Sequence, residues 1–401
     1  MIKLAWRNIW RNRRRSIITI ASVFFAIFFC VLLICFQTGA YEKLIDNMLR
    51  TQAGHIQIHA KDYWDDKIID NFMFMDTATI SALENIYEIE NVSPRVEIFS
   101  MASFGSVSKG IAVVGICPKK EDSKSNLSSH IVKGEYLSEH DNGILIGEGL
   151  AKYLKVTVGD TLALIGQGYH GSSATGLFPI RGILKLVINN MDNGMAYITV
   201  SSAQQFIDMT DGYSGILISI KNNNRLDKVI HQIEAIINTE LLDVYSWYFT
   251  MERLLQTMKS DTAATLLMSY ILYVIVGFGI LGTVIMMTNE RKREFCVVIS
   301  LGMARMKLVA TTAIELLIMS LMGIVVALAI TLPIAYWFNA NPIYLGSEMA
   351  EMYAQYGMEP FIPLSLDPSI FINQIIIVLV IVVLTTIYPV NNILKLKITR
   401  S

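Results

Sequence analysis

The sequence predicts a membrane protein with four transmembrane helices and a large α/β domain inserted between the first two. Hydrophobic residues make up 53% of the 401 residues and charged residues only 17%, which is too apolar for an ordinary soluble protein. Each of four stretches without charge exceeds the roughly 20 residues that cross a bilayer. These stretches cover residues 16–41, 262–289, 316–347 and 369–394.

The distribution of basic residues predicts the orientation of the chain in the membrane. Lys and Arg gather in residues 1–15, 290–307 and 395–401, whereas residues 337–394 contain none. Because basic loops stay in the cytoplasm, we expect both termini and the 290–307 loop to be cytoplasmic. The segment 42–261, with 19 basic and 27 acidic residues, then lies outside, and its charge gives no indication of nucleic-acid binding.

The amino terminus has the pattern of an amphipathic helix on the inner leaflet. Trp6 and Trp10 recur at helical spacing, with Arg7 and Arg11 on the neighbouring face. A cleaved signal peptide is the alternative, since a basic segment precedes an apolar run. That run is too long for a signal peptide and three more spans follow, so we expect a first transmembrane helix.

These observations divide the chain into nine segments in order. We expect a cytoplasmic amphipathic helix (1–15), the first transmembrane helix with its stalk (16–50), an extracytoplasmic α/β domain (51–244), the second stalk and transmembrane helix (245–289), a cytoplasmic coupling loop with a short helix (290–307), the third transmembrane helix (308–338), an extracytoplasmic loop (339–368), the fourth transmembrane helix (369–394) and a cytoplasmic tail (395–401).

We expect helical stalks outside the membrane, because apolar residues keep the helical period beyond the uncharged runs. This period continues after the first run and begins again before the second, so both helices are expected to extend beyond the membrane. The stalk side chains are our candidates for contact with a substrate. They are Leu44, Met48, Met251, Leu255 and Met258.

The loop that begins at Glu290 reads ERKREFCVVISLG, with charged residues first and an apolar, β-branched middle. This pattern predicts a short helix along the membrane surface, ended by Gly302, because glycine suits the position just past a helix end. A surface helix of this kind can be gripped by a partner protein. Glu315 follows inside the third span, where it either forms a structural pair, for example with a basic residue of the amino-terminal helix, or extends to the headgroups.

The exterior domain alternates strand-like and helix-like stretches over nearly two hundred residues. Strands are predicted at 55–59, 111–116, 161–165, 178–185, 196–200 and 215–221, and helices at 79–90, 148–155, 202–209 and 226–239. The polar segment 119–129 is predicted to be a flexible loop. The outer loop at 339–368 either lines a substrate entrance or caps the spans, and we favour the cap.

The sequence carries no pattern that predicts an enzyme. Residues 166–171 match G-x-G-x-x-G, but residues 172–176 read as loop instead of helix, so nucleotide binding is not expected there. There is no G-x-x-x-x-G-K-[ST], so ATP hydrolysis by that route needs another chain. His55 and His59 share one strand face, but two histidines alone do not predict a metal site. We expect no catalytic residue, metal or cofactor in this chain.

The order of parts resembles the ABC transporter permease family of MacB, FtsX and the lipoprotein-releasing LolC and LolE. ERKREFCVVISLGM is similar to the coupling motif of that family, and Glu315 falls where the family has an acidic residue. ILIGEGLAKYLKVTVGDTLALI resembles the periplasmic core domain, and GHIQIHAKDY resembles the lipoprotein-release members. The resemblance assigns ATPase coupling to Arg291, Arg293, Glu294, Phe295, Leu301 and Gly302.

The resemblance implies a permease of the bacterial inner membrane that dimerises with a second copy or a paralogue. Two separate cytoplasmic ATPase subunits would bind ATP and Mg and move the exterior domain through the loop helix. The leading hypothesis is release of lipoproteins or another hydrophobic substrate from the outer face of the membrane. The rival is a signalling permease like FtsX, which activates an exterior cell-wall hydrolase without transport. A third hypothesis is a membrane-tethered binding protein with no ATPase.

Overall fold

The computed structural model consists of two compact units. One contains the long apolar helices, and the other is an α/β domain. The structure describes residues 2–11, 13–61, 63–186, 188–341 and 364–395, of which 2–42, 257–341 and 364–395 belong to the helical unit and the remainder of the described chain, from 43 to 256, to the α/β unit.

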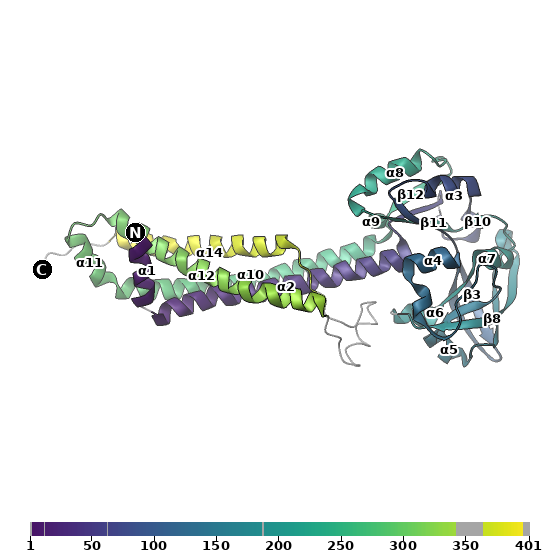
Figure 1. Ribbon diagram of the computed structural model, residues 1–401, viewed down its shortest axis with the longest axis horizontal. Coiled ribbons are helices and arrows are strands. Elements are labelled where there is room, and N and C mark those ends of the chain that lie inside the picture. The colour runs from purple at the N-terminus through teal and green to yellow at the C-terminus, as the bar shows by residue number, and fades with distance from the viewer. Residues whose placement is uncertain (1, 12, 62, 187, 342–363, 396–401) are drawn as a thin grey trace. The chain divides into compact units, whose positions relative to one another are not determined.

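Among the described residues of the helical unit, four helices are long and apolar enough to cross a membrane, which agrees with the four uncharged runs. They lie side by side around one apolar core to which all four contribute (Figure 1). The four long helices are α2 (Arg13–Met48), α10 (Glu252–Glu290), α12 (Arg305–Ala340) and α14 (Pro368–Leu394). Two shorter helices, α1 (Ile2–Arg11) and α11 (Lys292–Ser300), belong to the same unit. Gly323 allows α12 to approach α2 closely, because a Cβ there would lie 2.8 Å from the Cβ of Val23.

The α/β unit is organised by β3 (Ile89–Phe104), which takes part in two lobes. Its first half pairs with β11 in a sheet of order β12-β1-β11-β3, and its second half pairs with β4 and β7. The pairings β3-β4-β9-β6-β8-β7 return to β3 and close a six-stranded barrel. An apolar core fills the barrel lobe, and a second core lies against the β1 sheet.

The remaining strands and helices of this unit have between 2 and 12 residues. The strands are β1 (Ile56–Ala60), β2 (Met73–Phe74), β4 (Val107–Ile116), β5 (Ile131–Gly134), β6 (Ile144–Gly147), β7 (Thr161–Gln167), β8 (Ser173–Leu184), β9 (Met195–Thr199), β10 (Gly212–Tyr213), β11 (Gly215–Ile220) and β12 (Leu242–Ser246). The helices are α3 (Thr77–Glu84), α4 (Pro118–Ser125), α5 (Glu148–Leu154), α6 (Asn189–Gly194), α7 (Val200–Phe206), α8 (Leu226–Glu234) and α9 (Trp247–Thr250), and η1 (Leu49–Ala53) is a π-helical turn.

Two loop predictions in the α/β unit were wrong, and the helix predicted at 79–90 ends at Glu84 and gives way to β3 at Ile89. The polar segment 119–129 is not a flexible loop, because Pro118 begins helix α4 and Asn126 ends it in a left-handed conformation. Residues 172–176 are also not loop, since β8 begins at Ser173 and makes the G-x-G-x-x-G segment the connection of a β-hairpin. The composition of both stretches is typical of loops, although one stretch contains a helix and the other contains the start of a strand.

The outer loop predicted at 339–368 and the tail at 395–401 lie mostly outside the described residues. At the edges of the outer loop, α12 ends at Ala340 and α14 starts after its N-cap Asp367, whose carboxylate accepts from the amide of Ser369. The predicted roles of both segments stay predictions.

Candidate functional site

The charged loop between α10 and α12 folds into the predicted short helix, α11. Arg291 separates α10 from α11 by a single non-helical residue, and Leu301 caps the other end. Gly302 follows with φ +97°, a left-handed conformation that favours glycine. The amides of Gly302 and Met303 close the helix on the carbonyls of Ile299 and Val298. The helix end is therefore fixed by local chemistry.

The inner face of α11 is anchored by Phe295. This ring is 2% exposed and packs with Leu308 and Val309 of α12 and Ile393 of α14. The guanidinium of Arg291 lies 5.2 Å from the centre of the same ring. Burying a phenylalanine contributes about 1.5–3 kcal/mol. Phe295 thus holds α11 against the helical bundle.

Glu315 is a second anchor, since it is buried and paired. Its Oε2 atom lies 2.5 Å from Nη1 of Arg291, and its Oε1 atom accepts from Nδ2 of Asn8 in α1 at 2.5 Å. The structure therefore gives Glu315 a structural pair, and its carboxylate is 1% exposed instead of extending to headgroups. The basic partner is Arg291 of the loop, and the amino-terminal helix supplies an amide where we expected a cation.

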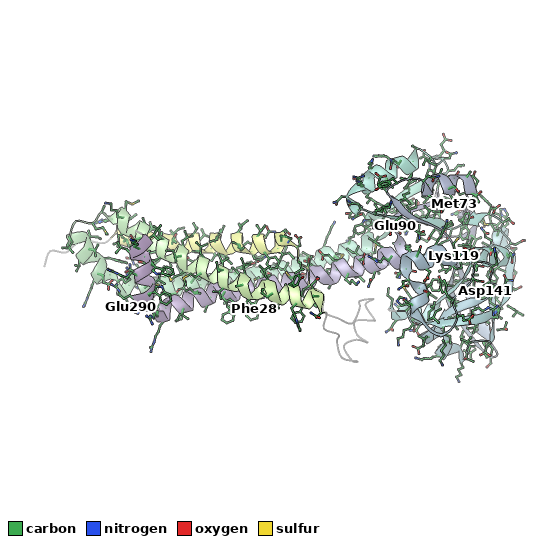
Figure 2. All side chains as sticks on the ribbon, in the orientation of Figure 1. Phe28, Met73, Glu90, Lys119, Asp141 and Glu290 are labelled. Carbon is green, nitrogen blue, oxygen red and sulfur yellow. The ribbon has the colours of Figure 1, made fainter. Side chains whose placement is uncertain are left out.

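The end of α1 and the start of α2 each make one further link to this region. Arg11 Nη2 lies 2.6 Å from Oε2 of Glu294, and Arg15 pairs with Glu290. Figure 2 shows Glu290 at the end of the bundle where α1 and α11 also lie. Arg11 and Glu294 are about half exposed, so their pair is worth at most about 1 kcal/mol. The sequence predicted an interfacial helix at this position but none of these partners.

The outer face of α11 is left open. Arg293, Val297 and Leu301 follow one another at i, i+4 and i+8 and are all exposed, with Leu301 82% and Val297 58% exposed. The six predicted coupling residues therefore divide into two groups. Arg291 and Phe295 are buried toward the bundle, whereas Arg293, Glu294, Leu301 and Gly302 are accessible. An exposed leucine beside basic and acidic residues is a surface that a second protein can cover.

The predicted stalk residues are mostly packed within the α/β unit. Met251 is buried in the core against the β1 sheet, and Met48 and Leu255 pack on the same core. Leu44 is buried, and Met258 is half-buried. Both helices continue beyond the uncharged runs, to Met48 in α2 and from Glu252 in α10. Their substrate contact stays a prediction.

An apolar groove lies between α2 and α10 within the helical unit. Its volume is about 580 Å³, and its walls are almost entirely apolar. Sequence reasoning did not find this groove, because the apolar periodicity of a transmembrane helix does not separate lipid-facing from groove-facing residues. The groove is lined by Phe29, Cys30, Leu32, Leu33, Met268, Ser269, Ile271, Leu272 and Ile275.

Two protein-family models match this chain, and together they cover residues of both units. The MacB-like periplasmic core domain matches residues 16–236, more than half of the chain, and the FtsX-like permease C-terminal domain matches residues 266–398. These matches define an ABC transporter permease with a MacB-like periplasmic α/β domain between its first two membrane helices. The chain belongs to the MacB, FtsX and LolC–LolE family, as the sequence motifs predicted.

Two relatives show how far the similarity extends. An uncharacterised ABC transporter permease of Methanocaldococcus jannaschii is 20% identical over 367 residues, which are 89% of this chain and 89% of that protein. The lipoprotein-releasing system transmembrane protein LolE of Haemophilus influenzae is 21% identical over 230 residues, 54% of this chain and 53% of LolE.

Two solved structures similar to this chain are an extracellular domain and a periplasmic region. The periplasmic region of MacB from Actinobacillus actinomycetemcomitans has 13% identity and a TM-score of 0.38, and covers 52% of this chain and 95% of its own. The extracellular domain of the ABC-type transporter YknZ from Gram-positive bacteria has 12% identity and a TM-score of 0.36, over 48% and 99%.

Proposed function

We propose that this permease couples ATP hydrolysis by separate cytoplasmic ATPase subunits to movements of its exterior domain. Through these movements it extracts lipoproteins or another hydrophobic substrate from the outer face of the cytoplasmic membrane. A complex with two ATPases has two permease chains, either two copies or a pair of paralogues. ATP and Mg are bound by the ATPases, and this chain transmits force.

The observation that carries this proposal is the two-sided construction of α11. Its inner face is tied to the bundle by Phe295 and by the Arg291–Glu315 pair, while Leu301 and Arg293 are open to solvent. If an ATPase subunit binds the exposed face of α11, the helix would move together with that subunit. Because the inner face is anchored to α12 and α14, that movement would reach the membrane helices.

The hydrophobic class of substrate is supported by the groove between α2 and α10. Acyl chains are stabilised by apolar walls, at about 0.8 kcal/mol for each buried methylene. The described residues that line the groove include Phe29, Leu33 and Ile275, and none of them is charged. An acylated protein, which carries such chains on a polar body, fits an apolar groove in a chain whose large domain is outside the membrane.

The experiment isolates the complex from its native membrane and changes the open face of α11. Leu301→Asp is expected to reduce ATPase capture and substrate-stimulated ATP hydrolysis at least tenfold. The reason is that a leucine which the bound ATPase would cover is replaced by a charge without a partner. Leu241→Asp makes the same change at an exposed position of the α/β unit, away from α11, and serves as the matched control for folding. Glu294→Ala tests the neighbouring acidic contact in the same assay.

The substrate is tested by identifying what copurifies. Lipoprotein or lipid retained by the native complex and lost from a Leu33→Trp variant of the groove supports extraction. A bound cell-wall hydrolase without lipid would instead assign the chain to signalling. If Leu301→Asp and Glu294→Ala both leave ATPase binding and transport unchanged, the coupling proposal fails.

A further inference from the structure

We propose that Arg95 and Glu121 form a clamp that makes the end of α2 move together with the exterior sheet. This inference deepens the proposed function, on which it rests, by naming the joint through which α2 would act on the α/β unit. All of the groups involved, from the turn η1 to α4 and β3, belong to that unit. No sequence pattern predicted a role for either residue.

The first step is the way in which α2 ends. It passes into the π-helical turn η1, closed by the amide of Gly54 on the carbonyl of Leu49 at 2.9 Å. The last carbonyls of a helix have no partner within the helix. The amide of His55, which a longer helix would use, bonds instead to Ile218 of β11 at 2.8 Å. The end of the turn therefore depends on side chains for its hydrogen bonds.

Arg95 supplies those bonds from the neighbouring strand β3. Its Nη2 donates to the carbonyl of Thr51 at 2.9 Å, and its Nη1 donates to the carbonyl of Gln52 at 3.1 Å. The next carbonyl, that of Ala53, accepts from the side chain of Gln57 at 2.8 Å. A cation at a helix C-terminus is also favoured by the helix dipole. Three successive carbonyls of the turn are thus bound from the exterior sheet.

Glu121 of α4 fixes the guanidinium from the other side. Its two oxygens accept from Nη2 and Nε of Arg95 at 2.7 and 3.3 Å, in the bidentate geometry that arginine forms with a carboxylate. Both side chains are buried, with 3% of Arg95 and 2% of Glu121 exposed. A buried charge must be paired, so the guanidinium cannot leave this position without a large penalty.

The position of Arg95 in β3 explains why this clamp would transmit movement. Arg95 is the last β3 residue paired with β11, opposite Gly215, and the next residue, Val96, begins the pairing with β4 of the barrel. Arg95 therefore lies where the two lobes of the unit meet. Through this side chain, a displacement of η1 would act on both lobes.

The connection between η1 and the sheet is short. Only Gly54 and His55 separate the turn from β1. Gly54 has φ +62°, and a Cβ there would lie 3.1 Å from the carbonyl oxygen of Ile218, so the chain turns tightly against β11. A cavity of about 150 Å³ borders the turn at Met48 and Thr51 and reaches Glu121 and Tyr197. Packing is thus incomplete on the side where the clamp acts.

The test uses the complete complex with its copurifying ATPase in nanodiscs, and hydrogen exchange of peptides from η1 and from the exterior strands. Arg95→Met/Glu121→Met removes both charges of the clamp together, so that neither is left buried without its partner. We expect exchange at η1 to rise at least tenfold while the centre of the barrel keeps its protection. ATP hydrolysis is expected to continue, but ATP should no longer change exchange in β3 and β11.

Two further variants separate the clamp from general stability. Arg95→Lys keeps the charge but not the fork of donors, so exchange at η1 should lie between the native and double-variant values. Arg225→Met removes an exposed ion pair of the same unit with Glu88 and should leave η1 and the ATP response unchanged.

The outcomes are distinguishable. If the double variant keeps native protection at η1, or keeps the ATP-dependent change in β3 and β11, the clamp proposal is overturned. If ATP changes nothing in the exterior strands of the native complex, the proposed function fails and the transmitting role of the clamp fails with it. Loss of the response only in the clamp variants supports both.

Discussion

At the scale of single residues, the most consequential contact of the coupling site is the buried pair of Arg291 and Glu315. Their atoms approach to 2.5 Å and both side chains are largely shielded from solvent. Removing one partner leaves a buried charge, which costs about 3–5 kcal/mol, whereas replacing both with apolar residues is often neutral. The pair therefore makes a sharp prediction about single and double variants.

Glu315→Met is expected to destabilise the helical unit by about 3–5 kcal/mol, and Arg291→Met/Glu315→Met to recover most of that loss. The measurement is thermal or denaturant unfolding of the purified permease in detergent. Arg11→Met is the control, because its pair with Glu294 is half exposed and is worth about 1 kcal/mol or less. Equal effects of Glu315→Met and Arg11→Met would contradict the importance of burial.

A second residue, Lys124 of α4, predicts a pH dependence of the α/β unit. Burial, followed by the charge of Arg95, lowers the pKa of its ammonium from 10.5 to about 7, and its Nζ is buried without a hydrogen-bond partner among the described residues. The unfolded chain then binds more protons than the folded chain between about pH 7 and 10.5. Stability should rise with pH in this window, by at most about 1.4 kcal/mol per pH unit.

Lys124→Met is expected to remove this slope and to stabilise the unit at pH 7 by on the order of 2 kcal/mol. Urea unfolding of the exterior domain in the full chain, followed at pH 7, 8 and 9, measures both effects. Lys119→Met is the matched control, because its side chain is 80% exposed and pairs only at the surface with Glu139. A slope that persists in Lys124→Met would assign the titration to another group.

At the scale of elements, helix α11 shows how much local chemistry can predict. The charged start, the apolar middle and Gly302 were sufficient to predict a short helix, because its capping depends on neighbouring residues in sequence. Its burial pattern was not predictable, since the contacts of Phe295 come from α12 and from α14, almost a hundred residues further along the chain. The buried and open faces became visible only with those helices in place.

The glycine that ends α11 can be tested on its own. Gly302→Ala is expected to cost about 1 kcal/mol, because φ +97° is strained for alanine although nothing lies within 4 Å of the added Cβ. Gly282→Ala in α10 also meets nothing within 4 Å but has helical geometry, so it should be neutral or stabilising. The difference in melting temperature between these variants measures the turn, and equal values would exclude a role for its conformation.

The polar helix α4 and the long strand β3 mark the limit of sequence reasoning for elements. The KKEDSKS composition of α4 indicated a loop, but Glu121 is buried there because Arg95 of β3 pairs with it. Pairing across 26 residues leaves no periodic signal in either segment. β3 was missed because it changes partners at Arg95, so that its alternation of buried and exposed residues is interrupted.

At the scale of the whole molecule, the distribution of charged residues is the most informative feature of the sequence. Four spans, the insertion between the first two and the family itself could be predicted, because bilayer thickness dictates run length and the motifs are local. The groove between α2 and α10 and the clamp at Arg95 could not, because each forms from residues far apart in sequence. Orientation is the remaining whole-molecule property, and it can be measured directly.

The orientation prediction concerns exposed positions in each unit. In a variant with Cys117→Ser and Cys296→Ser, we expect Ser108→Cys in β4 to react with a membrane-impermeant maleimide added to intact cells. Ser300→Cys in α11 should react only after the membrane is opened, because basic loops are retained in the cytoplasm. Both serines are exposed, so accessibility within the protein does not distinguish them. Labelling of Ser300→Cys in intact cells would place α11 outside and remove the ATPase-coupling site from the side where ATP is available.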